Sequence, residues 1–389
     1  MTERSVLIGP LTVSFSDDPF CTDVIETMYG QLENSDSPAD IRIRGHDWQE
    51  IGIPTDLNTK ATDSITLENG VIHVDQRRPH SPPVSWLTDR IGQRGCILRI
   101  EGWESSTLSI DIYYDGKLYE NNLSPVRWAL QANNNTFVSY ANGLAKAFVY
   151  NIFEPLVQGW ILSKGISFLH SASILLEENA IVMTGAGGAG KTSSTSMLIK
   201  QSDDIHFMSD DLSFISEDGV VYPYYKSSMI YAYNTAGSTI NENELLEGMI
   251  DRSHWKWRKQ QFGDHGVRRR VPPEKLFDGQ VAPPTGQTLG AAIYLIREKR
   301  EQIQHEHIST PELARRSTGV IIDELDWLIE YSAALCSAGL DTTPQKILKD
   351  TESVYKKSFA DAKTTLVRIP TETGPDELAK YLRMEVLRA

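Results

Sequence analysis

The chain has 389 residues, of which 40% are hydrophobic and 23% are charged, as in an ordinary soluble globular protein. This length is sufficient for two domains that each have a core. The formal net charge of −14 disfavours general nucleic-acid binding through phosphate neutralisation, and no apolar run is long enough to span a membrane.

The opening residues MTERSVLIGPLTV lack the basic, apolar and small-residue order of a secretory signal peptide. The three cysteines, Cys21, Cys96 and Cys336, lie far apart and match no metal-binding or redox spacing. Both observations predict a cytoplasmic protein in a reducing environment, without a membrane partner.

Residues 1–125 are predicted to form a mainly β, α+β amino-terminal domain, because short apolar or alternating segments are separated by turn residues. The strand candidates are SVLIGPLTVSF, ADIRIRG, SITLENGVIHVD, GCILRIEG and STLSIDIYYDGKLY. Asn69-Gly70 and Asp115-Gly116 have the composition of hairpin turns. One amphipathic helix is expected at about 22–31, and the segment DQRRPHSPPVSW contains too much proline for regular structure.

Residues 126–165 are predicted to be a helical connection, and residues 166–389 an α/β domain. Two strands joined at 177–179 are expected in ISFLHSASILLEENAIVMTG, followed by a helix that ends near Lys200. Further strands are expected at IHFM, at GAAIYLIRE and at 365–369, with a hairpin at 217–219. The remaining helices are predicted at 318–337, 344–358 and 375–387.

A glycine-rich turn follows the second of these strands, in AIVMTGAGGAGKTSSTSMLIK. The segment from Gly185 to Thr192 matches G-x-x-x-x-G-K-[ST], the Walker A pattern. In such a loop the backbone amides bind the β-phosphate, Lys191 reaches the β- and γ-phosphate oxygens, and Thr192 ligates magnesium. The chain is therefore predicted to bind ATP, or another nucleoside triphosphate, with Mg²⁺. The residues expected at the nucleotide are Gly185, Gly187, Gly188, Ala189, Gly190, Lys191, Thr192 and Ser193.

A pair of aspartates, Asp210 and Asp211, begins nineteen residues beyond Lys191, where the next core strand should end. One carboxylate at this place can bind magnesium, and its neighbour can accept the proton of an attacking hydroxyl, as phosphoryl transfer requires. The alternative is a turn-forming or helix-capping pair. A guanine-reading N-K-x-D element is not found downstream, and the signature glycines of ABC-type ATPases are also missing, so a kinase is the P-loop class that fits.

The stretch FLHSASILLEENAIVMTGAGGAGKTSSTSMLI, with MSDDLSFI after it, resembles the carboxy-terminal domain of HPr kinase/phosphorylase and its kinase-like relatives. In that family a histidine begins the strand before the P-loop strand, and here His170 lies fifteen residues before Gly185. The resemblance is strongest over residues 168–215 and is weaker in RRRVPPEKLFDG and LIGPLTVSFSDDPFCTDVIETMYGQL. It implies an α/β P-loop kinase core. The family's Arg- and Gly-containing phosphorylase signature is not recognisable, which leaves reverse dephosphorylation without support.

The resemblance also implies roles for individual residues. Asp210 would be the general base and Asp211 the magnesium ligand or its helper, although the sequence leaves this division open. His170 would lie beside the transferring phosphate and assist the base, and Lys191 would act on the phosphate oxygens.

The segment HWKWRKQQFGDHGVRRR, residues 254–270, concentrates basic and aromatic side chains in an otherwise acidic chain. It is either a solvated loop or a cationic flap over phosphates or an acidic substrate; nucleic-acid binding is disfavoured by the overall charge. Arg268, Arg269 and Arg270 are candidates to neutralise charge that develops on a phosphate or substrate.

These observations predict a cytoplasmic kinase that transfers the γ-phosphoryl group of ATP to a hydroxyl group. The acceptor would be a Ser or Thr of a protein or peptide, as the resemblance suggests, or the hydroxyl of a small molecule. A nucleotide-gated binding module without phosphoryl transfer is the alternative from another class. The amino-terminal domain would recognise the substrate, and the family's tendency to oligomerise makes a homo-oligomer a candidate state.

Overall fold

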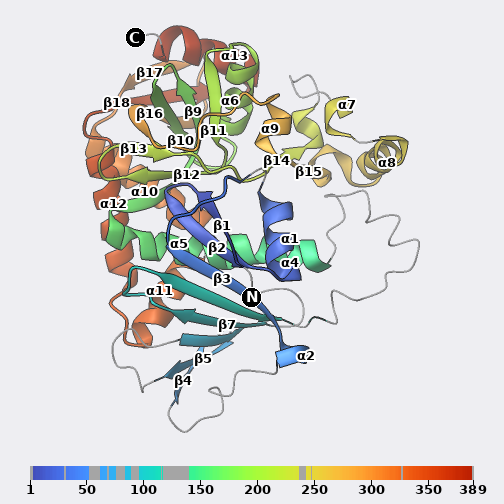
Figure 1. The fold of residues 1–389 in the computed structure, drawn as a ribbon. Helices are drawn as coiled ribbons and strands as arrows, with labels where there is room; N and C mark the ends of the chain where they lie inside the picture. Colours follow the sequence, from blue (N-terminus) through green and yellow to red (C-terminus); the bar gives the residue numbers. More distant parts are fainter. Residues whose placement is uncertain are drawn as a thin grey trace. The chain divides into compact units, whose positions relative to one another are not determined.

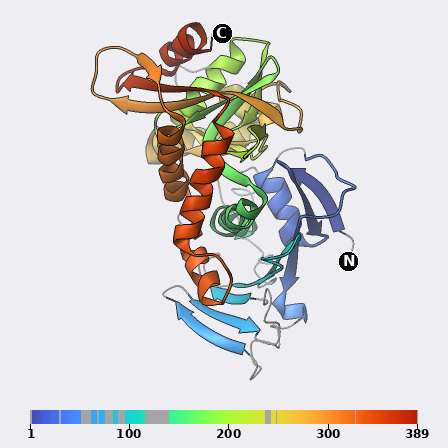
Figure 2. The same cartoon turned by 90° about the vertical axis from the view of Figure 1, so that its left-hand side faces the viewer.

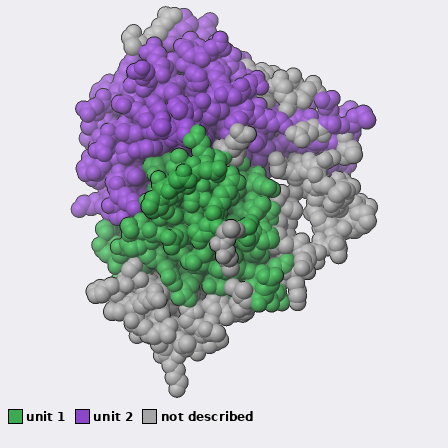
Figure 3. All heavy atoms as spheres, in the orientation of Figure 1, with its two compact units in different colours: residues 1–160, 325–347 green, residues 161–324, 348–389 purple. Residues whose placement is uncertain are grey.

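The computed structural model describes residues 3–29, 32–51, 62–67, 70–75, 84–88, 96–114, 116, 140–235, 242–246, 248–325 and 327–387. The chain divides into two compact units, residues 1–160 with 325–347 and residues 161–324 with 348–389 (Figure 3). The sequence predicts boundaries at 125 and 165 instead, with all later residues in one domain. Residues 325–347 join the first unit because α11 (Trp327–Ser337) packs there, and the Tyr331 hydroxyl donates to the Asn151 carbonyl at 2.6 Å.

The first unit is built on an eight-stranded sheet with the order β1-β2-β3-β8-β7-β6-β5-β4 (Figure 1). Its strands are β1 (Glu3–Ile8), β2 (Leu11–Ser16), β3 (Ile41–Asp47), β4 (Thr62–Leu67), β5 (Gly70–Asp75), β6 (Val84–Thr88), β7 (Cys96–Glu101) and β8 (Leu108–Tyr114). β3 is parallel to both β2 and β8, and the other neighbours are antiparallel.

The described residues of the amino-terminal part of the chain lie mostly in these strands. The prediction of irregular structure was wrong for Val84 to Trp86, which lie in β6 between β5 and β7. Every proline of that segment precedes Val84 and therefore leaves the amides of the strand free to pair. The hairpin predicted at Asp115-Gly116 and the helix predicted over 126–139 involve residues outside the described part of the chain.

The helices of the first unit are α1 (Pro19–Met28), α2 (Trp48–Ile51), α4 (Tyr140–Phe148), a π-helical turn (Val149–Phe153), α5 (Glu154–Ile161) and α11. α4, the π-helical turn and α5 follow one another without a gap, and Figure 2 views this helical segment end-on. α1 begins three residues earlier than predicted. Asp18 caps it by accepting a hydrogen bond from the Cys21 amide at 3.0 Å, and Pro19 occupies the first turn.

The second unit contains a mixed sheet with the order β10-β9-β12-β13-β16-β18-β17, in which β11 also pairs with β9 and β10 also pairs with β16. Its strands are β9 (Ile166–Leu176), β10 (Asn179–Thr184), β11 (Ile205–Ser209), β12 (Leu212–Ser216), β13 (Val220–Tyr222), β16 (Gln287–Glu298), β17 (Gln304–His307) and β18 (Lys363–Pro370). β10, β16 and β18 are parallel neighbours. β14 (Ser228–Tyr231) and β15 (Arg268–Val271) form a separate antiparallel pair.

The helices of the second unit are α6 (Lys191–Lys200), α7 (Glu242–Leu245), α8 (Gly248–Gly266), α9 (Pro273–Leu276), α10 (Thr310–Glu324) and α13 (Pro375–Tyr381), which continues into a π-helical turn (Leu382–Val386). α12 (Pro344–Ser358) begins in the first unit and continues into the second after residue 347. α6 lies beside α13 (Figure 1) and buries Met197, Leu198 and Ile199 in the core of the unit.

Two predictions for this part of the chain were wrong. The single helix predicted over 318–337 is divided into α10 and α11, because the chain passes from one unit to the other at residues 324–325. Of the two interpretations of the basic segment 254–270, the solvated loop was wrong. Residues 254–266 lie in α8, whose helical path is interrupted at Gly263, and residues 268–270 lie in β15. The described helices include none that is both long and apolar enough to cross a membrane.

Candidate functional site

The glycine-rich turn connects the end of β10 at Thr184 to the start of α6 at Lys191. Gly185 has a φ of 142°, and a Cβ atom there would lie 2.3 Å from the Leu295 carbonyl oxygen, so only glycine fits against β16. Gly188 has a φ of 77°, and a Cβ at either Gly187 or Gly188 would meet nothing within 4 Å. The turn is thus pressed against the sheet at its start and open at its tip, where a ligand could approach the bare backbone.

Lys191 is buried at the first position of α6. Its Nζ donates to the carbonyls of Gly185 at 2.6 Å and Ala186 at 3.1 Å, so the ammonium group rests on the glycine-rich turn. Burial lowers the pKa of Lys191, against the opposing effect of the nearby carboxylates. The turn therefore carries a desolvated positive charge.

The structure brings the aspartate pair to this turn. Asp210 and Asp211 connect β11 to β12, and the Thr192 hydroxyl donates to Asp210 Oδ1 at 2.7 Å. Burial raises the pKa of Asp210, which the hydrogen bond from Thr192 opposes. The Asp210 carboxylate is consequently more basic than that of an exposed aspartate.

Asp211 lies in a different environment from Asp210. Its φ of 81° is in the left-handed region, which non-glycine residues rarely adopt outside functional or tightly held sites. Its Oδ2 accepts from the Nζ of Lys226 at 2.8 Å, and Lys226 is only 2% exposed. Burial tends to raise the pKa of Asp211, but Lys226 and His170 hold this pKa below its ordinary value. Asp211 is therefore ionised at neutral pH.

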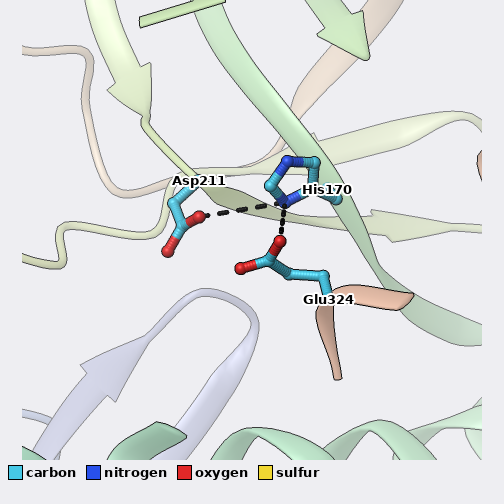
Figure 4. Close-up of side chains that lie close together, drawn as sticks. All are labelled: His170, Asp211 and Glu324. Atoms are coloured by element: carbon cyan, nitrogen blue, oxygen red, sulfur yellow. Dashed lines mark ion pairs between the residues drawn. The ribbon is translucent and has the colours of Figure 1, made fainter. Parts of the chain in front are cut away.

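His170 lies in β9, with Nδ1 3.8 Å from Asp211 Oδ1 and 3.5 Å from Glu324 Oε2 (Figure 4). The side chain is buried, and burial together with the charge of Lys191 lowers the pKa of His170 to about 4, although Asp211 acts in the opposite direction. The imidazole is neutral at physiological pH.

Sequence reasoning did not identify Lys226 and Glu324. Lys226 is the single charged residue in the aromatic segment VVYPYYKSS, and a lone cation in such surroundings could have indicated a buried partner. Glu324 was hidden inside the single helix predicted over 318–337. It is in fact the last residue of α10, where the chain leaves the helix.

The structure separates the three candidate arginines. Arg269 is buried and donates to both carboxylate oxygens of Asp251 and to the Leu245 carbonyl. Arg270 is buried and donates to the Ser227 carbonyl at 3.4 Å. Arg268 is exposed and donates to the Tyr231 hydroxyl at 3.1 Å. Both terminal nitrogens of the Arg269 guanidinium are thus occupied within the fold, which assigns this arginine a structural role.

Replacing Arg269 with alanine is expected to lower the free energy of unfolding by about 3–5 kcal/mol, because the Asp251 carboxylate would stay buried without its guanidinium partner. The measurement is equilibrium unfolding in urea. The control is Arg268→Ala, at an exposed position in the same strand, which is expected to change stability by less than about 0.5 kcal/mol. Equal stability of the Arg269→Ala variant and the unaltered protein would exclude a structural role for this ion pair.

A scan against models of protein families and a search of curated proteins both found no match for this chain. The site is therefore characterised by its own residues and their geometry. Within the described part of the chain, that geometry joins a glycine-rich turn, a buried lysine and two aspartates of opposite pKa shift.

Proposed function

We propose that this chain is an ATP- and Mg²⁺-dependent P-loop kinase, similar to HPr kinase, that phosphorylates a Ser or Thr hydroxyl of a protein or peptide. The observation that carries the proposal is the 2.7 Å hydrogen bond from Thr192 to Asp210. It joins the G-K-T end of the glycine-rich turn to a carboxylate eighteen residues away in sequence.

The residues around the turn fit a nucleoside triphosphate. Gly187 and Gly188 expose backbone where a phosphate could approach, and Lys191 would move its ammonium group from the turn's carbonyls to phosphate oxygens. The Thr192 hydroxyl donates a hydrogen bond to Asp210, and the lone pairs of the Thr192 oxygen remain available to a magnesium ion. Bound Mg-ATP would supply the electrophilic γ-phosphoryl group and the metal charge that neutralises it.

We assign the two aspartates different tasks because their pKa values shift in opposite directions. Asp210 binds Thr192 through Oδ1, and its raised pKa suits Oδ2 to accept the proton of the acceptor hydroxyl. Asp211 stays ionised beside Lys226, which suits it to bind a cation. We assign His170 to the same task as Asp211, since the Nδ1 of His170 faces the Asp211 carboxylate.

Incubation with Mg-ATP and a pool of Ser- and Thr-containing peptides is expected to add phosphate to hydroxyl groups, detected by mass spectrometry. A parallel reaction with a pool of small metabolites tests whether the acceptor is a small molecule and not a peptide. The same reactions with Asp210→Asn supply the control, in which the product should be lost. ATP binding without a phosphorylated product in either pool would favour the nucleotide-gated binding module.

A further inference from the structure

Three side chains from distant parts of the second unit point toward one another (Figure 4). His170 comes from β9, Asp211 from the connection between β11 and β12, and Glu324 from the end of α10. One potential ligand atom of each lies within 4.8 Å of those of the other two. A nitrogen and two carboxylate oxygens thus surround a common point.

No hydrogen bond explains the burial of the polar Nδ1 atom of His170. The residue is 6% exposed, and among the described residues no hydrogen-bond partner is found for its Nδ1. The carboxylate oxygens at 3.5 and 3.8 Å are too far for a hydrogen bond, which requires about 2.7–3.2 Å. A buried polar atom without a partner costs about 1–3 kcal/mol, so an additional group between these three side chains would stabilise the arrangement.

We propose that His170 Nδ1, Asp211 Oδ1 and Glu324 Oε2 bind one divalent transition-metal ion, of the Mn²⁺ or Zn²⁺ kind, at a site separate from the nucleotide's magnesium. Imidazole nitrogen together with carboxylate oxygen is a ligand set that these ions accept. Mg²⁺ instead prefers oxygen ligands and retains its waters.

The surroundings of the three ligands support a cation. Lys226 holds Oδ2 of Asp211, which leaves Oδ1 directed toward His170. The neighbouring carboxylates, which are Asp210, Asp211 and Glu324, outnumber the ammonium groups of Lys191 and Lys226. A bound cation would therefore reduce a net negative charge.

The positions of the ligands also allow them to close on an ion. Metal–ligand bonds of about 2.0–2.2 Å require the donor atoms to lie slightly closer together than they do here. Glu324 is exposed at the end of α10, whereas His170 is buried within β9. The site thus combines a buried nitrogen ligand with an exposed carboxylate, and it requires no nucleotide.

The test is a titration of the full chain with Mn²⁺ in the absence of nucleotide, with free Mn²⁺ measured by electron paramagnetic resonance. We expect one Mn²⁺ per chain, retained in about a hundredfold excess of Mg²⁺ and displaced by Zn²⁺. Glu324→Gln, which removes a ligand charge at an exposed position, should weaken Mn²⁺ binding by about tenfold or more. His170→Ala should weaken it similarly.

Asp323→Asn is the matched control, because Asp323 is the neighbouring exposed carboxylate and loses the same charge. It should leave the Mn²⁺ affinity unchanged. The site is excluded if no saturable Mn²⁺ binding occurs without nucleotide, or if Glu324→Gln and Asp323→Asn behave alike. Displacement of Mn²⁺ by an equal concentration of Mg²⁺ would also overturn the proposal. Phosphoryl transfer is not measured, so these outcomes are independent of the proposed kinase activity.

Discussion

Replacing Lys191 with alanine is expected to reduce γ-phosphate-dependent turnover by at least about 10²- to 10³-fold, the loss typical of removing one preorganised charge or donor. Lys191 Nζ lies against the carbonyls of Gly185 and Ala186, so its charge is placed on the turn that would hold the phosphates. The measurement is phosphate release or transfer from γ-labelled ATP under single-turnover conditions.

The same substitution should leave the protein folded. Burial lowers the pKa of Lys191, which means that folding disfavours its charged form and offsets part of what is lost with its two hydrogen bonds to the turn. Thermal unfolding should therefore occur near the temperature found for the unaltered protein. Lys191→Met retains the hydrocarbon stem and should lose turnover equally, which separates the charge from packing.

Lys349→Ala provides a control for the loss of a lysine elsewhere in the same unit, since Lys349 is exposed on α12. It should change neither turnover nor stability. Full turnover by Lys191→Ala would remove the glycine-rich turn from the mechanism and leave it as a connection between β10 and α6.

The local parts of this site could be predicted from the sequence. Gly185, Lys191 and Thr192 belong to one contiguous pattern, and the strand before it and the helix after it follow from residues 180–200 alone. The aspartate pair could be located because it directly follows the next apolar run. Each of these predictions uses information contained within about twenty residues of chain.

The partners of those residues could not be predicted, because tertiary contacts determine them. Lys226 contacts Asp211, although β12 and β13 separate the two residues along the chain. Glu324 lies near His170, although its helix is more than a hundred residues further along the chain. Helical periodicity continues through residues 318–337 and therefore gives no sign that the chain changes units after Glu324.

The partners of the three arginines could not be predicted from the sequence either. Clustered positive charge at 268–270 suggests a phosphate site when read as sequence, but successive strand residues face opposite sides. Asp251, which engages Arg269, lies in α8, a helix whose alternating basic and aromatic residues lack a clear apolar face. The sequence pattern therefore indicated charge without indicating its partner.

Replacing Asp210 with asparagine is expected to lower phosphoryl transfer by about 10²- to 10⁴-fold while nucleotide affinity changes little. Asparagine has the same shape, and its Oδ1 can still accept the proton of the Thr192 hydroxyl, so the link between the turn and the pair should persist. What the variant lacks is a carboxylate able to accept a proton. Transfer rates and nucleotide affinity should be measured on the same preparation.

The pH dependence gives a second, independent readout of this role. A base acts when ionised, so turnover should fall as the pH drops through the pKa of Asp210, which burial raises above the ordinary aspartate value of about 3.9. The residual activity of Asp210→Asn should lack this acidic limb. Unchanged transfer by Asp210→Asn would exclude Asp210 as the general base. If nucleotide binding and phosphoryl transfer are both lost, Asp210 would instead be a magnesium ligand. The carboxylate that accepts the hydrogen bond from Thr192 would then be needed to hold the ion.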